Sequence, residues 1–502
     1  MSNKIARKSA KDSFESVLKI AKKLKNPCYI LEESKLQENL EILASVRAQS
    51  GAKILLALKG FAFWSSFKMV AKYLDGITAS GYYEARLGLE EFRKHNKKAI
   101  ISVFSPAFTA CEIKQIAPFA NHIIFNSFNQ FVAFRKFAKK AHIALRLNPL
   151  YSEVEPEIYN PCAPFSRLGI VPDEFEKGVK AHGLQGIKGL HFHTHCEQNS
   201  DALERTIETI ERHFGKYIAQ MEWINFGGGH HITRKDYDLN RLVSVISRFR
   251  KKYGVEVILE PGEAIGWQCG VLVGEVVDIV RNGVDIAIVN LSAATQMPDC
   301  LEMPYTPEIV GARILSNSSL TQSSRELEKS AFDRQQVLSQ ADFSVQPTNL
   351  TQDTKIANDS KHDSSLQDSP CESKQSKATS DSAEVSLSDF VGFGAIGREN
   401  RTLSPLSAQE RTIPQKHQRD NRAIYRLGCP SCLAGDIIGD YIFDSPLKIG
   451  DKIIIKDMIH YTIVKNNLFN GIPLPSLAIL KKNGKLKIVR KFGYDDYKKR
   501  NG

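Results

Sequence analysis

The chain has 502 residues, of which 42% are hydrophobic and 25% are charged, so it has the composition of a globular protein with room for two or three domains. Its net charge of +12 collects largely in the tail 481–500, which we interpret as solvated because no nucleic-acid-binding motif accompanies it. No apolar run approaches the ~18 residues that a membrane helix needs, no signal peptide is visible, and nine scattered cysteines do not form a disulfide framework, so we expect a cytoplasmic protein that binds neither membrane nor nucleic acid.

Eight short apolar runs alternate with helix-like segments between residues 52 and 262. The runs are AKILLAL, GITAS, AIISVFS, HIIFNS, HIALRLN, GIKGLHFHTH, EWINFGGG and EVILEPG. Their nearly continuous apolar character is typical of buried parallel strands, and the segments between them carry apolar residues at helical spacing. Eight alternating units predict an α/β fold with a closed (β/α)8 barrel of the TIM type over residues 32–265.

The pattern changes after the eighth run. Strand-like segments without long helices predict a β-rich C-terminal domain over residues 266–315 and 421–502. The early segment CYIL, within the N-terminal residues 1–31, lies too far upstream for the barrel and is expected to join that domain as a strand. Residues 316–420 are rich in Ser, Gln, Asp, Lys and Asn, and we expect a long disordered insertion there because such a segment buries too little apolar surface.

The predicted strand ends carry chemically useful residues. Lys59 ends the first strand, where a lysine close to a barrel core would have a lowered pKa and could form a Schiff base, although most lysines lie on the surface. Gly227, Gly228 and Gly229 follow the seventh strand, a position where barrels often bind phosphate through backbone amides. Glu260 ends the eighth strand, and a pyridine nitrogen is a fitting partner for a buried carboxylate. Together they point to a phosphate-bearing carbonyl cofactor.

Two further motifs have competing interpretations. His191, His193 and His195 alternate along the sixth strand, so a metal site is possible, but no matching acidic ligands appear elsewhere and we favour one histidine stacked on a cofactor ring. Cys429 and Cys432 form a CxxC motif that lies in a predicted loop of the β domain. A redox role normally requires a βαβ unit, so a thiol working in an active site is the better interpretation.

With these residues placed, the chain resembles the fold-type III pyridoxal-phosphate decarboxylases, and more closely the carboxynorspermidine/carboxyspermidine decarboxylases. The stretches that carry the resemblance include KILLALK, TASGYYEARLG, LRLNP, HFHTHCE, NFGGGHH, LEPGEA, MPDCLEMPY, YRLGCPSCLAGD and HYTIVKNNLFNG. They cover about residues 27–310 and 422–490.

The resemblance implies a role for each matching residue. Lys59 would hold pyridoxal 5'-phosphate covalently, His193 would stack on its ring, and Glu260 would pair with its pyridine nitrogen. The phosphate and the rest of the cofactor would be held by Gly227, Gly228, Gly229, Gly262, Tyr461 and Arg146. Cys432, which would return a proton to the substrate carbon, and Asp436, which would bind substrate, would reach across from the second subunit of a homodimer with shared active sites. Glu263 and Asp299 match acidic positions for a polycationic, carboxylated polyamine.

Some positions depart from the family pattern. Glu263 replaces an arginine that often binds the phosphate, Ile77 stands where relatives place an aspartate, Gln296 stands where close ones tend to have histidine, and the insertion after Arg313 is foreign to the family. The implied reaction is decarboxylation of carboxynorspermidine or carboxyspermidine to norspermidine or spermidine. Alternatives are the decarboxylation of diaminopimelate, ornithine or arginine, an amino-acid racemase, and a cofactor carrier without activity. Glu260 argues against the racemase, because such enzymes place arginine against the pyridine nitrogen.

Overall fold

The computed structural model describes residues 17–155, 157–315 and 423–502. Within these ranges the chain forms a closed eight-stranded parallel barrel and a separate mixed sheet, which confirms the predicted fold class. The expected insertion and the first part of the N-terminal segment lie outside the described residues, so the domain boundaries remain a prediction.

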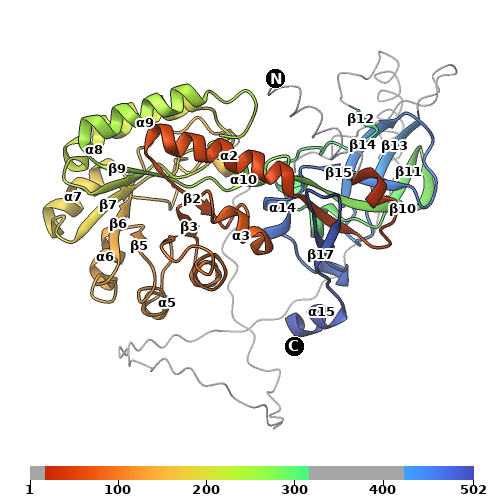
Figure 1. The fold of residues 1–502 in the computed structure, drawn as a ribbon, viewed down its shortest axis with the longest axis horizontal. Helices are drawn as coiled ribbons and strands as arrows, with labels where there is room; N and C mark the ends of the chain where they lie inside the picture. Colours follow the sequence, from red (N-terminus) through yellow and green to blue (C-terminus); the bar gives the residue numbers. More distant parts are fainter. Residues whose placement is uncertain (1–16, 156, 316–422) are drawn as a thin grey trace, which may run out of the picture. The chain divides into compact units, whose positions relative to one another are not determined.

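The barrel consists of strands β2 to β9, in chain order (Figure 1). Their bounds are β2 Lys53–Ala57, β3 Gly76–Ala79, β4 Ile100–Ser105, β5 His122–Phe125, β6 His142–Arg146, β7 Ile187–His191, β8 Trp223–Asn225 and β9 Glu256–Leu259. The register of β2 with β9, in which Lys53 is opposite Ile258, closes the barrel. Aliphatic side chains from five strands, with Trp223, pack into a small core of their own, as expected for a filled barrel interior.

The helices around the barrel follow the predicted alternation. Their bounds are α2 Glu33–Ser50, α3 Phe67–Val70, α4 Tyr82–Leu87, α5 Ala110–Ile116, α6 Phe128–Phe134, α7 Pro172–His182, α8 Ser200–Ile218, α9 Leu239–Tyr253 and α10 Glu263–Gly266. Local signals explain where several of them begin and end. Asp238 caps α9 by accepting from the Arg241 backbone N–H, and Gly254, with φ +71°, ends it in the left-handed region.

One predicted helix, YYEARLGLEEFRK, is divided. The segment changes from α4 to a π-helical turn, Gly88–Phe92. At Gly88 an added Cβ would lie 2.6 Å from Cγ1 of Ile77 on β3, so only a glycine allows this close approach to the barrel. The departure at Ile77 thus serves packing, since its side chain is fully buried.

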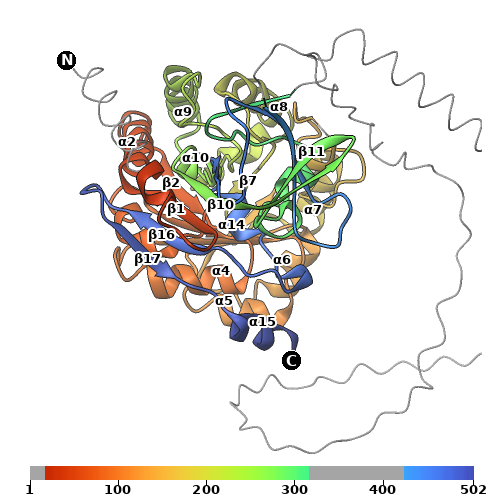
Figure 2. The same ribbon diagram turned by 90° about the vertical axis from the view of Figure 1, so that its right-hand side faces the viewer.

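The second sheet has nine strands among the described residues. Their bounds are β1 Cys28–Glu32, β10 Gly270–Asn282, β11 Val284–Val289, β12 Ala312–Ile314, β13 Ala423–Gly428, β14 Ile437–Phe443, β15 Lys452–Lys456, β16 Ser476–Leu480 and β17 Leu486–Arg490. The order is β12-β14-β13-β11-β10-β1-β16-β17, with β15 also paired to β10. Figure 2 shows β1 beside β10 and β16, so the early CYIL segment does belong to this sheet.

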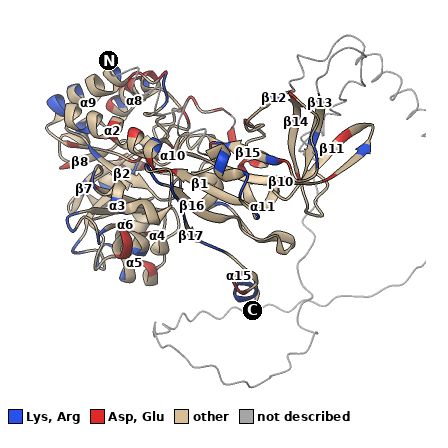
Figure 3. Ribbon diagram, turned by 45° about the vertical axis from the view of Figure 1, so that its right-hand side comes forward, with Lys and Arg blue, Asp and Glu red and all other residues tan. Residues whose placement is uncertain are grey.

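Short helices lie in the connections between the strands of this sheet and after its last strand. The sequence pattern did not predict them. They are α11 Ala293–Gln296, α12 Asp299–Glu302, α14 Tyr461–Val464 and the C-terminal α15 Tyr494–Asn501. Figure 3 shows both acidic and basic residues on α15, so the end of the basic tail is mixed in charge. Among the described residues no helix is long and apolar enough to cross a membrane.

Candidate active site

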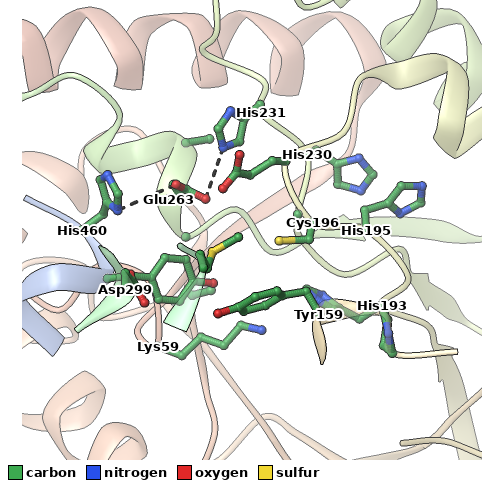
Figure 4. A pocket seen from close by; sticks show the side chains of 18 of the residues that line it. Lys59, Tyr159, His193, His195, Cys196, His230, His231, Glu263, Asp299 and His460 are labelled. Carbon is green, nitrogen blue, oxygen red and sulfur yellow. Dashed lines mark ion pairs between the residues drawn. The ribbon is translucent and has the colours of Figure 1, made fainter. Parts of the chain in front are cut away.

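A cavity of about 1530 Å³ opens at the carboxyl ends of the barrel strands. One part of its wall comes from residues that follow β2, β3, β6, β7 and β9, among them Lys59, His193 and Glu260. The other part comes from the second sheet and its short helices, including Asp299, Tyr461 and Lys465. Figure 4 shows side chains from both parts pointing into the same space. The cavity therefore brings together residues as far apart in the chain as Lys35 and Lys465.

Lys59 lies two residues beyond β2, in a tight turn where the Gly60 N–H donates to the Ala57 carbonyl (3.0 Å). Its side chain is exposed to the cavity. Enclosure away from bulk water, together with the positive charge of Arg146, lowers the pKa of the Lys59 amine. A larger fraction of the amine is thus neutral and nucleophilic than for a surface lysine.

Glu260 follows β9 directly and is buried. Oε1 accepts a hydrogen bond from Nδ2 of Asn225 (2.7 Å), and Oε2 lies 3.4 Å from Nε2 of His191. Burial raises the pKa of this carboxyl, but His191, Asn225 and the Thr78 hydroxyl outweigh burial and hold the pKa below its usual value. The cavity therefore contains a buried carboxylate that stays ionised at neutral pH.

His193 lies against the glycine turn that follows β8. The Gly228 N–H donates to Nδ1 of His193 (2.9 Å), and burial holds the pKa of the ring well below its usual value, so the imidazole is neutral. The turn requires glycine: Gly227 and Gly229 have φ of +69° and +80°, and a Cβ on Gly229 would lie 1.9 Å from the His195 carbonyl oxygen. Gly229 itself lines the cavity.

Arg146 ends β6 and is buried, with its guanidinium 4.5 Å from the centroid of the Phe104 ring. One N–H donates to the His193 carbonyl (3.3 Å), whereas Nε has no partner among the described residues. Burial lowers the pKa of Arg146 to about 10, so it remains a cation at neutral pH. The Nε–H of Arg146 is therefore available to donate a hydrogen bond to an anionic or polar oxygen.

These residues fit pyridoxal phosphate. The group needs an amine for its aldehyde, a carboxylate for its ring nitrogen, and donors for its anionic oxygens. Lys59 and Glu260 supply the first two, and Arg146 has a donor to spare. An added Cβ at Gly262 would lie 3.1 Å from the Gly60 Cα. The wall of the cavity next to Lys59 therefore has little room for a side chain at this position. Tyr461, on α14, lines the same cavity.

The sequence pattern predicted that His191, His193 and His195 alternate along one strand, but only His191 lies on β7, and the three do not form a group of potential metal ligands among the described residues. β7 ends at His191, which lies near Glu260 as described above. His195 instead has Nδ1 3.0 Å from the Thr194 hydroxyl, and its ring lies 4.8 Å from that of His230 at an interplanar angle of 31°. Their different partners favour separate roles over a shared metal ion.

The far side of the cavity is acidic. Glu263 begins α10, and its carboxylate lies 3.2 Å from Nε2 of His231 and 3.8 Å from Nδ1 of His460 (Figure 4). Its pKa is raised by burial, but His231 and His460 bring it below its usual value. Asp299 begins α12 and forms an ion pair with Lys465, which also pairs with Glu302 at 2.5 Å. Reasoning from sequence named Glu263 and Asp299 but missed His231, His460 and Lys465.

Cys432 and Asp436 do not line this cavity. Both lie in the loop between β13 and β14, where Cys432 is exposed and Asp436 is buried. Asp436 accepts from the Ser292 hydroxyl (2.7 Å) and the Ala294 N–H (2.9 Å), which fixes the loop. Gln296, another departure from the family pattern, is also buried and donates to the Pro473 carbonyl (3.0 Å) rather than lining the cavity.

Comparison with known proteins identifies the family. No protein-family model matches the chain. The carboxynorspermidine/carboxyspermidine decarboxylase of Campylobacter jejuni is 41% identical over 479 residues, covering 95% of this chain and 99% of the relative. This chain belongs to the carboxynorspermidine/carboxyspermidine decarboxylase family. The carboxyaminopropylagmatine decarboxylase of a Synechocystis species is 34% identical, over 95% of this chain and 96% of the relative.

Solved structures agree with the fold. The carboxynorspermidine decarboxylase from Campylobacter jejuni, in complex with norspermidine, superposes with a TM-score of 0.69 at 39% identity, over 95% of this chain and all of that chain. Diaminopimelate decarboxylase from Helicobacter pylori superposes with a TM-score of 0.66 at 14% identity, over 97% and 98% of the two chains. The second likeness concerns the fold alone.

Proposed function

We propose that this enzyme removes CO₂ from carboxynorspermidine or carboxyspermidine with the help of pyridoxal 5'-phosphate, and releases norspermidine or spermidine. The observation that carries the proposal is a cavity with an amine of lowered pKa and an ionised buried carboxylate at one end, and the carboxylates of Glu263 and Asp299 at the other. A substrate with an α-amino acid head and a cationic tail matches both ends.

When bound, the cofactor would withdraw electrons from the substrate α-carbon, which makes the loss of CO₂ possible. Lys59 would hold the cofactor and later be replaced by the substrate amine. Its lowered pKa favours both roles, because a larger fraction of the Lys59 amine is neutral. Glu260 would keep a proton on the ring nitrogen, since its own pKa is held low. His193 would lie against the ring, and Arg146 and the glycine turn would supply donors to anionic oxygens.

We further propose a cytoplasmic homodimer in which the partner subunit's Cys432 returns the proton to the α-carbon and the partner subunit's Asp436 fixes that loop. In support, Cys432 is exposed and lies outside the cavity of its own subunit. The neighbouring side chain of Leu433 is 46% exposed, and Phe165 at the rim of the cavity is fully exposed, as expected for residues that a second subunit covers. Sedimentation analysis of the holoenzyme tests the dimer. Mixing inactive Lys59→Ala subunits with inactive Cys432→Ala subunits should restore activity at one of the two sites.

The decisive experiment for the reaction is the release of CO₂ from a panel of substrates. We expect the purified protein to be yellow, to bleach with hydroxylamine, and to act on carboxynorspermidine and carboxyspermidine far faster than on ornithine, arginine or diaminopimelate. Carboxyaminopropylagmatine belongs in the panel, because a relative of 34% identity carries that name. One methylene distinguishes the two principal substrates and is worth only ~1–3 kcal/mol of discrimination.

A further inference from the structure

The loop between β13 and β14 is held at two points by contacts with distant segments of the chain. Asp436, at the end of the loop, accepts from the Ser292 hydroxyl and the Ala294 N–H. The second point is Cys432, whose backbone N–H donates to Oδ1 of Asn470 (3.0 Å), a residue 38 positions further along the chain. This contact fixes the backbone at the residue to which the proposed function assigns proton transfer.

Asn470 reaches the loop from a backbone conformation that few residue types adopt. It lies in the turn Phe469–Gly471 with φ +57° and ψ +13°, in the left-handed region that glycine, asparagine and aspartate tolerate best. A glycine would fit the same backbone but would offer no acceptor to the Cys432 N–H. Asparagine therefore satisfies two requirements at this position, the conformation of the turn and the hydrogen bond to the loop.

A second asparagine anchors the turn that carries Asn470. Oδ1 of Asn467 accepts from the Phe469 N–H (2.9 Å), and its Nδ2 donates to the Ala294 carbonyl (2.9 Å). Ala294 is also the residue whose N–H binds Asp436. The two points that hold the loop are thus linked through the peptide groups of Ala294, so the side chain of Asn470 acts from a fixed position.

We infer that Asn470 is a positioning residue for the thiol of Cys432. The inference rests on the proposed function, in which this loop enters the cavity of the other subunit. In agreement, Cys432 and Asn470 are both exposed in the single subunit, and neither lines its own cavity. A proton donor must lie within about 3 Å of the atom that it protonates. Because a misplacement of about 1 Å is enough to impair such a step, a loop released from Asn470 should misdirect the proton.

The destination of the proton can be read from the products. When the proton returns to the substrate α-carbon after the loss of CO₂, norspermidine is released and the cofactor is regenerated. When it goes instead to the cofactor carbon that is bonded to the nitrogen, hydrolysis releases an aldehyde and leaves the nitrogen on the cofactor as pyridoxamine 5'-phosphate. The ratio of pyridoxamine 5'-phosphate to norspermidine therefore reports where the proton goes, and a mere loss of folded protein does not change it.

The test compares Asn470→Gly with Asn470→Asp and with a matched control, Asn483→Gly. Glycine keeps the left-handed backbone and removes the acceptor, whereas aspartate keeps both. Asn483 is exposed in the turn between β16 and β17, where its Oδ1 accepts from the Lys485 N–H (3.1 Å). The control thus removes an asparagine acceptor from a turn of the same sheet without touching the Cys432 loop.

We expect Asn470→Gly to raise the ratio of pyridoxamine 5'-phosphate to norspermidine by about tenfold, with KM for carboxynorspermidine within about twofold of the wild type. Asn470→Asp should restore the wild-type ratio, and Asn483→Gly should not alter it. A second measurement does not depend on activity: amide hydrogen exchange at Cys432 in the holoenzyme should become about tenfold faster in Asn470→Gly, and stay near the wild-type rate in the other two variants.

The positioning role is overturned by a wild-type product ratio in Asn470→Gly, by an equal rise in Asn483→Gly, or by a failure of Asn470→Asp to restore the ratio. Cys432→Ala separates this role from the proposed function. A wild-type ratio in Cys432→Ala would remove the thiol from proton transfer, and the positioning role would fall with it. A raised ratio in Cys432→Ala alone would overturn only the role of Asn470. If the wild type releases no CO₂ from carboxynorspermidine, the proposed function fails, while amide exchange at Cys432 still decides whether Asn470 holds the loop.

Discussion

The cavity has a basic end around Lys59 and an acidic end around Glu263, and the two ends are built from different kinds of structure. The basic end follows the barrel strands closely: Lys59, Arg146 and Glu260 each lie at or within two residues of a strand end. The acidic end relies on loops and short helices, with Glu197 after β7, Asp299 on α12, and His460 and Lys465 flanking α14. Rigid strands suit groups that must hold a cofactor in one position, whereas loops are where substrate specificity usually varies.

The two ends also differ in how burial and neighbouring charges shift the pKa values of their residues. At the basic end, Lys59 and Arg146 both have lowered pKa values, because burial disfavours the charged forms. At the acidic end the shifts differ: opposite charges or donors move the pKa values of Glu263 and Lys465 toward their charged forms, whereas burial raises the pKa values of Glu197 and Asp299.

The largest expected effect is at the basic end. Lys59→Ala should lower CO₂ release by at least ~1000-fold, because the cofactor loses its anchor and the leaving amine. The visible absorbance that is sensitive to hydroxylamine should disappear, while circular dichroism remains that of the wild type. Wild-type absorbance in this variant would remove Lys59 from the anchor position.

Glu260→Gln should reduce kcat by roughly 100-fold, since the amide accepts the hydrogen bond from Asn225 but no longer supplies the charge. The KM for carboxynorspermidine should change much less, because the substrate tail binds at the other end. Steady-state kinetics give both values. A change confined to KM would place Glu260 in substrate binding instead.

At the acidic end, Lys465→Met should free the carboxylates of Asp299 and Glu302, which share the Lys465 ammonium group. Without the ammonium group, Asp299 is left with no cation, so a ligand with one more amine than norspermidine has a second site to occupy. We expect the Kd of spermine to fall about fivefold, measured by calorimetry. Lys456→Met, which frees only the exposed Glu308, is the matched control and should show no change. Weaker spermine binding in Lys465→Met would mean that Lys465 supports the pocket rather than blocking it.

The smallest effect concerns pH. Burial lowers the pKa of His460, but Asp457, Glu263 and Asp299 outweigh burial and raise it above its usual value. Folding therefore favours the protonated ring, and its contribution is complete below the pKa of an unfolded histidine, ~6.5, and is lost as the pH rises through the higher folded value. The free energy of unfolding of the wild type should exceed that of His460→Asn most near pH 6, and the difference should shrink toward pH 9. A difference that grows with pH would reverse the assigned charge.

The residues at the basic end of the cavity could be predicted from the sequence more fully than those at the acidic end. Lys59 and Glu260 were predictable because the strands of a closed parallel barrel all end at the same rim, so residues that follow the first and eighth strands must converge. The glycine turn was predictable for the same reason. The helix lengths were less predictable. The close contact between Gly88 and Ile77 divides a segment of helical apolar spacing, and the spacing alone does not reveal that contact.

By itself, the sequence determined the (β/α)8 barrel, the β-rich second domain, the family and the residues of the basic end, because each depends on local apolar patterning or on motifs within one strand and its turn. Only the tertiary structure decided which acidic groups pair with which lysine or histidine. Lys465 is 166 residues from Asp299 along the chain, and Glu197 and Glu263 belong to different strand-end loops. Whether a carboxylate carries an internal counter-ion depends on which long-range segments fold against it, and no local pattern encodes that pairing.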